Sequence, residues 1–289
     1  MAKHDGQIAR QRMPPGVWDT DFASVARDCA IAAIQRRSTN RLGDTHFIKR
    51  LRYRDRSFYL KVRHIFASSD PNIALDPTRL HFEYRILECV NAVEKSLVPS
   101  VHGFIHHPAA IVLEDLEDAG FQPILQHEDV LSNDQVNGLG YGIASLHTAL
   151  NKSSANQLFD NPSRNTTPKP GTHIIHGDLN TKNILLSKND VRFLDFENCR
   201  IGYREHDIGW CLGHILIIDN DLTRCRERVN ALMSGYKGAF AHLDKSRILD
   251  TINSAIRYRM TAPPGSPFFS TVNLDPSDTL AEVSRALAN

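Results

Sequence analysis

The chain reads His176-Gly-Asp-Leu-Asn-Thr-Lys-Asn183 and, a short hairpin later, Leu194-Asp-Phe-Glu197. Short apolar runs flank these two stretches at 173–175, 184–186 and 191–194. Such runs, bounded by polar turn residues, predict short β-strands that frame a polar loop. The fold must therefore present a loop rich in Asp and Asn at the ends of neighbouring strands.

The side chains of this loop suit phosphoryl transfer. Transfer to an alcohol needs a carboxylate that accepts the hydroxyl proton and oxygen ligands that hold Mg²⁺ on the phosphates. Asp178 can be the base, and Asn183 and Asp195 can be the metal ligands, because Mg²⁺ prefers hard oxygen donors. The plainer interpretation is ordinary turn chemistry. The order of the three residues, with the second Asp at the end of the following strand, favours the site.

The residues before this loop predict a β-rich N-terminal part. Apolar residues at three- and four-residue steps predict an amphipathic helix over 21–37, and β-rich runs joined by a polar turn predict a hairpin over 46–63. Asp76-Pro77 predicts the start of a second helix, since Asp caps free N–H groups and Pro loses no bond at the first helical position. Two further short strands are expected at 98–104 and 109–114.

Beyond residue 116 the pattern is mainly helical. Ser132-Asn-Asp-Gln135 predicts a capping box at the start of a helix. Three glycines at 138, 140 and 142 lie inside that helix, where no strand precedes them, so we interpret them as sites of close packing and not as a dinucleotide loop. A polar loop follows over 151–171, which could cover an acceptor site or be a plain insertion. Helical spacing continues over 205–260.

Composition excludes several classes of protein. Lys and Arg number 34 against 33 Asp and Glu, a net charge of +1, so no overall field would hold nucleic acid. The longest nearly apolar run, 210–218, is far shorter than the roughly 20 residues of a membrane span. Five cysteines without a C-x-x-C pair predict buried free thiols in a reducing compartment. We therefore expect a cytoplasmic protein with neither a membrane nor a nucleic acid as partner.

In this order, the His-Gly-Asp, Asn and Asp-Phe-Glu motifs resemble those of the aminoglycoside phosphotransferase-like small-molecule kinases, a family that includes choline, methylthioribose and fructosamine kinases. The resemblance implies an α+β, two-lobed, protein-kinase-like fold. It divides the chain into a mostly β N-terminal lobe, 1–115, with an αC-type helix, and a mainly helical lobe, 116–289, with ATP between them. It also implies that Asp178 is the catalytic base and that Asn183 and Asp195 bind magnesium.

The N-terminal lobe offers a cation for the phosphates. Lys61 lies in the middle of a predicted strand, where it can neutralise the α- and β-phosphates. Glu83, on the predicted second helix, resembles the family's αC glutamate and would orient Lys61. Glu88, one turn further along the helix, is the alternative partner.

The remaining site residues follow from the resemblance. The stretch Glu114-Asp115-Leu116 resembles the family's hinge, whose backbone groups bind the adenine edge. Gly43 lies where the phosphate loop is expected, although the segment 41–47 has fewer glycines than the family pattern. Asp207 matches an element that braces the catalytic loop, and Glu197 would add a second carboxylate near the metal.

Together these features predict an ATP- and Mg²⁺-dependent phosphotransferase for a hydroxyl of a sugar, amino alcohol, nucleoside-like compound or antibiotic, with GTP left open as an alternative donor. Ten acidic and ten basic residues over 201–289 favour a neutral or mildly charged acceptor. A non-catalytic pseudokinase is the alternative, and a protein kinase is disfavoured because its His-Arg-Asp, Asp-Phe-Gly and Ala-Pro-Glu sequences are absent. The oligomeric state is left open.

Overall fold

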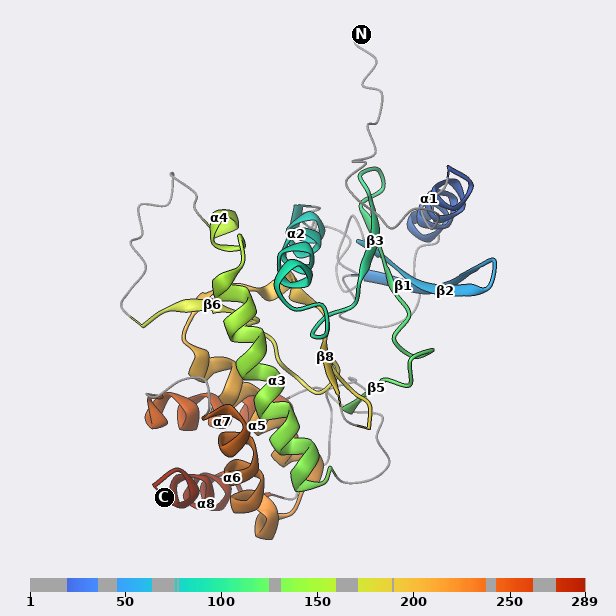
Figure 1. The fold of residues 1–289 in the computed structure, drawn as a ribbon. Coiled ribbons are helices and arrows are strands. Elements are labelled where there is room, and N and C mark those ends of the chain that lie inside the picture. The colour runs from blue at the N-terminus through green and yellow to red at the C-terminus, as the bar shows by residue number, and fades with distance from the viewer. Residues whose placement is uncertain are drawn as a thin grey trace. The chain divides into compact units, whose positions relative to one another are not determined.

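The computed structural model describes residues 20–35, 46–63, 76, 78–124, 131–159, 171–188, 190–237, 243–261 and 274–288 (Figure 1). The chain divides into two compact units. Unit 1 consists of Met1–Glu88 and Pro99–Ala119, and unit 2 of Cys89–Val98 and Gly120–Asn289.

Unit 1 contains a four-stranded antiparallel sheet in the order β1-β2-β4-β3. Its elements are α1 (Thr20–Gln35), β1 (His46–Tyr53), β2 (Arg56–Arg63), most of α2 (Thr78–Val93), β3 (Val101–Ile105) and β4 (Ala110–Glu114). The predicted helix, hairpin, second helix and strand pair are all confirmed, each within a few residues of its expected bounds.

The core of unit 1 explains why α1 forms. Four residues at steps of three and four along α1, all buried, share one cluster with apolar side chains of β1, β2 and β4; they are Phe22, Ala26, Ala30 and Ala33. This spacing places them on one face of a helix. The start of α2 is fixed by Asp76, whose Oδ1 accepts hydrogen bonds from the Thr78 backbone N–H (2.8 Å) and hydroxyl (2.6 Å).

Unit 2 is mainly helical, as predicted. Its helices are α3 (Asn133–Lys152), α4 (Asn156–Phe159), α5 (Arg204–Asp219), α6 (Cys225–Tyr236), α7 (Lys245–Met260) and α8 (Pro276–Ala288). Two small antiparallel sheets accompany them, β5-β7-β8 and β6-β9. The strands are β5 (Gln122–Pro123), β6 (His173–Ile175), β7 (Ile184–Leu186), β8 (Val191–Phe193) and β9 (Arg200–Gly202). The sequence did not predict β5 or β9.

Helix α3 confirms the predicted capping box and, at two of its three glycines, the predicted close packing; at Gly138 the prediction is wrong, because a Cβ there would meet nothing within 4 Å. Ser132 and Gln135 form the reciprocal capping box. A Cβ on Gly140 would lie 2.2 Å from the Leu232 carbonyl oxygen on α6, and one on Gly142 would lie 2.1 Å from the Val191 Cγ1 on β8. These contacts are too close for any side chain, so the glycines allow α3 to pack directly against its neighbours.

The cysteines agree with the expectation of free thiols. All five are unpaired, and four of them are buried: Cys89, Cys199, Cys211 and Cys225. Burial raises the pKa of the Cys211 thiol, which keeps it protonated and unreactive. None of the helices in the described ranges is long and apolar enough to cross a membrane.

Candidate active site

The loop between β6 and β7 carries the predicted base, and helix α5 fixes its backbone. Asp207, in the first turn of α5, accepts the His176 backbone N–H on Oδ2 and the Gly177 N–H on Oδ1, both at 2.8 Å. Gly177 has φ +83°, in the left-handed region that favours glycine. The carboxylate therefore holds the loop at its turn, just before Asp178.

Asp207 is fully buried and belongs to a hydrogen-bonded chain of side chains. His147 on α3 donates from Nε2 to Asp207 Oδ2 (2.9 Å), and His147 Nδ1 lies 2.8 Å from the Tyr236 hydroxyl on α6. Burial acts to raise the pKa of Asp207, but the hydrogen bonds and charge of its histidine and backbone partners outweigh it and lower that pKa. Asp207 is thus ionised, and both of its carboxylate oxygens accept hydrogen bonds that hold the loop in place.

The carboxylate of Asp178 is half-buried and its two oxygens differ. Oδ1 accepts hydrogen bonds from Asn180 Nδ2 (2.9 Å) and from the indole Nε1 of Trp210 (3.1 Å). Oδ2 has a longer contact, 3.4 Å, with Asn183 Nδ2. The first oxygen is therefore anchored by two neutral donors, and the second is held more loosely.

Asn183 and Asp195 lie at adjoining strand ends. Asn183 donates from Nδ2 to the Asp178 carbonyl (3.0 Å), so its amide oxygen is at the opposite end of the group. The Asn183 carbonyl accepts the Leu194 N–H (2.8 Å), and the Leu194 carbonyl accepts from His176 Nε2 (2.8 Å). Asp195 follows directly, with φ 66°. These bonds tie the loop to Leu194, the residue that directly precedes Asp195 in the chain.

The donor set of this cluster fits Mg²⁺ better than a transition metal. It offers one carboxylate and one amide oxygen, both hard ligands, and Mg²⁺ is commonly held by one or two protein oxygens together with waters and phosphates. Within the described residues, no group of three or more His, Cys, Asp or Glu side chains could hold a metal by itself. Glu197, half-buried in the short 3₁₀ helix Phe196–Asn198, lies two residues after Asp195.

In unit 1, Lys61 on β2 pairs with Glu83 on α2. Lys61 Nζ lies 2.7 Å from Oε2 and 2.9 Å from Oε1 of Glu83, and both side chains are buried. Glu88 instead accepts the Tyr84 hydroxyl at 2.7 Å. Of the two partners considered from the sequence, the structure places Glu83 against the lysine.

The predicted hinge residues are partly occupied by contacts within unit 1. The Glu114 N–H donates to the Ser100 carbonyl (2.9 Å), and the Leu116 carbonyl accepts the Ala119 N–H (3.1 Å). The Asp115 carboxylate forms an ion pair with Arg50. Any adenine contact must therefore use other backbone groups of this segment. Gly43 and residues 160–170 of the predicted 151–171 loop lie outside the described residues.

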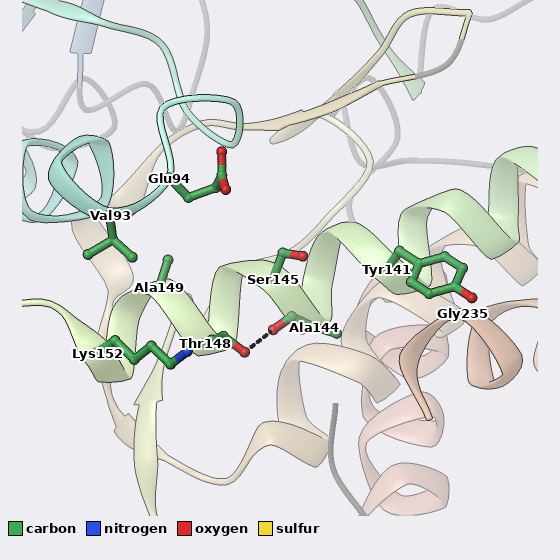
Figure 2. Close-up of a pocket in the computed structure, with 9 residues that line it drawn as sticks. All are labelled: Val93, Glu94, Tyr141, Ala144, Ser145, Thr148, Ala149, Lys152 and Gly235. Carbon is green, nitrogen blue, oxygen red and sulfur yellow. Dashed lines mark hydrogen bonds between the residues drawn. The ribbon is translucent and has the colours of Figure 1, made fainter. Parts of the chain in front are cut away.

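A surface groove of about 490 Å³ lies elsewhere on unit 2 (Figure 2). It is formed by the end of α2, one face of α3 and one residue of α6, and its lining residues are Val93, Glu94, Tyr141, Ala144, Ser145, Thr148, Ala149, Lys152 and Gly235. None of these is a predicted site residue. Several of the lining residues are small and offer few functional groups for binding or catalysis. The groove is therefore not the candidate active site.

The sequence did not predict two contacts of Asp178, those with Asn180 and Trp210. Trp210 lies three residues after Asp207 on α5, a spacing that puts both side chains on the same side of the helix. This spacing could have predicted the contact. If Asp207 faces the loop between β6 and β7, a residue three positions later on the same helix faces that loop as well.

His214, one turn after Trp210, gives this region a pH-sensitive stability. It is buried, donates from Nδ1 to the Trp210 carbonyl (2.8 Å), and its Nε2 has no hydrogen-bond partner within the described structure. Burial lowers its pKa to about 4. Because the native pKa is below that of the unfolded chain, the unfolded state binds the proton first and stability falls as the pH drops from about 6.5 toward 4.

We expect His214 to remove roughly 3 kcal/mol of stability over that pH range, from a pKa difference of about 2.5. Urea unfolding at pH 7.5 and pH 4.5 measures the loss. The His214→Leu variant should show a clearly smaller difference between the two pH values than the parent chain. An equal difference in both proteins would assign the acid sensitivity to other groups.

Residues 155–245 match the model of the phosphotransferase enzyme family (APH), and this range contains Asp178, Asn183, Asp195, Glu197 and Asp207. No curated protein matches the chain in sequence.

Solved structures share the fold over nearly the whole chain. Amicoumacin kinase hAmiN, in complex with AMP-PNP, Ca²⁺ and Ami, is 15% identical, with 93% of this chain and 94% of that chain covered and a TM-score of 0.56. An aminoglycoside phosphotransferase from Alicyclobacillus acidocaldarius is 12% identical (97% and 94% covered, TM-score 0.52). Aminoglycoside-3'-phosphotransferase of type VIII is 15% identical (89% and 99% covered, TM-score 0.52).

At these identities the solved structures establish the fold, and the family match covers the stretch that carries the motifs. The predicted α+β, protein-kinase-like fold is confirmed. The family match over residues 155–245 and the shared fold confirm the predicted resemblance of this chain to the aminoglycoside phosphotransferase-like small-molecule kinases.

Proposed function

We propose that the protein transfers the γ-phosphoryl group of ATP to a hydroxyl of a small molecule, with Asp178 as the catalytic base. The observation that carries the proposal is the cluster of Asp178, Asn183 and the Leu194-Asp195 strand end, joined by hydrogen bonds of 2.8 to 3.4 Å. Asp178 and Asn183 are in contact, and Asp195 follows the strand end that is bonded to Asn183, so residues of the right chemistry occur here in the right order.

The geometry of Asp178 suits a base that orients its substrate. Oδ1 is anchored by Asn180 and Trp210, and Oδ2 is available to accept the proton of the acceptor hydroxyl as it attacks phosphorus. Catalysis of this kind is mostly positioning and electrostatics, because the transferred group undergoes little covalent chemistry with the protein.

The remaining residues would bind the nucleotide and its metal. The amide oxygen of Asn183 and the carboxylate of Asp195 would hold Mg²⁺, which, when bound, neutralises charge on the phosphates. Lys61, oriented by Glu83, would contact the α- and β-phosphates, and a backbone group of 114–116 would bind adenine. Asp207 keeps the loop in shape through its hydrogen bonds to His176 and Gly177.

The acceptor is proposed as a neutral or mildly charged alcohol: a sugar, an amino alcohol, a nucleoside-like compound or a similar antibiotic. The equal numbers of acidic and basic residues over 201–289 support this choice. Four buried free thiols out of five support a reducing cytoplasm as the location.

A coupled ADP-release assay tests the proposal. Purified protein is incubated with ATP or GTP, with Mg²⁺ or with EDTA, and with a panel of sugars, amino alcohols, nucleosides and aminoglycosides. We expect acceptor-dependent ADP release that requires Mg²⁺. Magnesium-dependent ATP binding without turnover on any acceptor would contradict the proposal and would favour the non-catalytic pseudokinase.

A further inference from the structure

We propose that Trp210 is a positioning residue whose indole N–H holds the Asp178 carboxylate in its working orientation. The inference rests on the proposed function, since it assigns a role toward the base of that reaction. Its evidence is a hydrogen bond that links two residues 32 positions apart in the sequence.

The contact is direct and its geometry is good. Trp210 Nε1 donates to Asp178 Oδ1 at 3.1 Å. An indole N–H is a donor only, so it can bind the carboxylate in one way. On the same helix, Asp207 binds the backbone of the loop at His176 and Gly177. Helix α5 thus fixes both the backbone of the loop and the carboxylate that the loop carries.

Three rings hold the indole in place. The ring of His206 is stacked on it, with centroids 5.9 Å apart and planes 13° apart. The rings of His214 and Tyr258 lie 4.9 and 5.7 Å from it in tilted arrangements. With rings from α5 and α7 around it, the half-buried indole has little rotational freedom, and its N–H stays directed at Asp178.

The two carboxylate oxygens of Asp178 would therefore have different roles. Oδ1 is occupied by Trp210 and Asn180, so the proton of an acceptor hydroxyl goes to Oδ2. If the indole donor is lost, the carboxylate can rotate and place either oxygen toward the acceptor. This would disturb the reacting geometry and leave nucleotide binding unchanged, because the contacts of Trp210 described above include none of the residues proposed to bind the nucleotide.

The kinetic test is the Trp210→Phe variant, which keeps an aromatic ring for stacking and removes the donor. Hydrogen bonds to charged groups contribute enough that we expect kcat to fall by about tenfold to a hundredfold, with the KM for ATP changed by less than about twofold. Trp210→Leu, which removes the ring as well, should lower kcat at least as much. An unchanged kcat in a folded Trp210→Phe protein would overturn the proposal.

A spectroscopic test needs no turnover. The chain has two tryptophans, Trp18 and Trp210, so ¹⁵N-labelled indole groups give two NMR signals that a Trp18→Phe variant assigns. We expect the Trp210 signal to shift in Asp178→Asn and to stay in place in Asp190→Asn, which changes an exposed aspartate in the β7–β8 turn. A Trp210 signal that ignores the Asp178 substitution would overturn the proposal, even where Trp210→Phe fails to fold.

The two tests separate this inference from the proposed function. If the Trp210 signal responds to Asp178 and no acceptor is phosphorylated, the contact stands and the kinase assignment fails. If acceptors are phosphorylated, but Asp178→Asn does not shift the Trp210 signal and Trp210→Phe does not lower kcat, the kinase assignment stands and the positioning role fails.

Discussion

An Asp178→Ala variant should lose about three orders of magnitude in turnover, since a positioned general base contributes roughly a hundredfold to ten-thousandfold and this one also orients the acceptor. The cause is the removal of both carboxylate oxygens from a loop whose backbone is held independently by Asp207. The fold and the affinity for ATP should therefore persist. The coupled ADP-release assay gives kcat, and isothermal titration with a non-hydrolysable ATP analogue gives the affinity.

Asp190→Ala serves as the matched control, because it removes an exposed carboxylate twelve residues further along the same segment. This control should retain parental turnover. Asp178→Asn, which keeps the size of the side chain, distinguishes loss of the charge from loss of the contacts. If Asp178→Ala and Asp190→Ala had equal activity, another residue would be the base.

An Asp207→Ala variant should lose about 3 to 5 kcal/mol of folding stability, the usual cost of removing one partner from a buried charged network. The substitution leaves the N–H groups of His176 and Gly177 and the imidazole of His147 without their acceptor. Urea unfolding at pH 7 measures the loss. A stable variant that lost less than about 1 kcal/mol would show that water replaces the carboxylate at this site.

Asp250→Ala, an exposed aspartate on α7, is the control for this substitution and should change stability little. The pH dependence gives a second check. The pKa of Asp207 is lowered in the folded state, so its contribution is present above the ordinary Asp value and is lost as the pH falls through the lower native value. The variant should lack this part of the acid-unfolding profile.

The elements with a long repeated pattern could be predicted from the sequence. Helices α1 and α3 each run for 16 residues or more, and their buried residues recur at helical spacing. This periodicity made both helices predictable from the sequence. Strands β5 (Gln122–Pro123) and β9 (Arg200–Gly202) lack the short apolar runs by which the equally short β6, β7 and β8 were predicted. Their existence depends on pairing with β7 and β6, which the sequence alone does not reveal.

In the candidate site, too, some features could be predicted from the sequence and others could not. Asp178, Asn183 and Asp195 were predicted because their types and order carry chemistry. The sequence favoured Glu83 over Glu88 through its resemblance to the αC glutamate, and the packing of α2, which brings Glu83 to 2.7 Å from Lys61, agrees with that choice. The ion pair between Asp115 and Arg50 had no sequence signal, because 65 residues separate the two side chains.

The glycines of α3 and α6 limit how this protein can be engineered. A Cβ on Gly235 would lie 2.0 Å from the Asn137 carbonyl oxygen, and Gly140 and Gly142 meet their neighbours at similar distances. A mutant library that aims to change the activity of this protein should therefore leave these three codons untouched. At Gly140 and Gly235 even alanine would force α3 and α6 apart, and at Gly142 it would press on the Val191 side chain of β8.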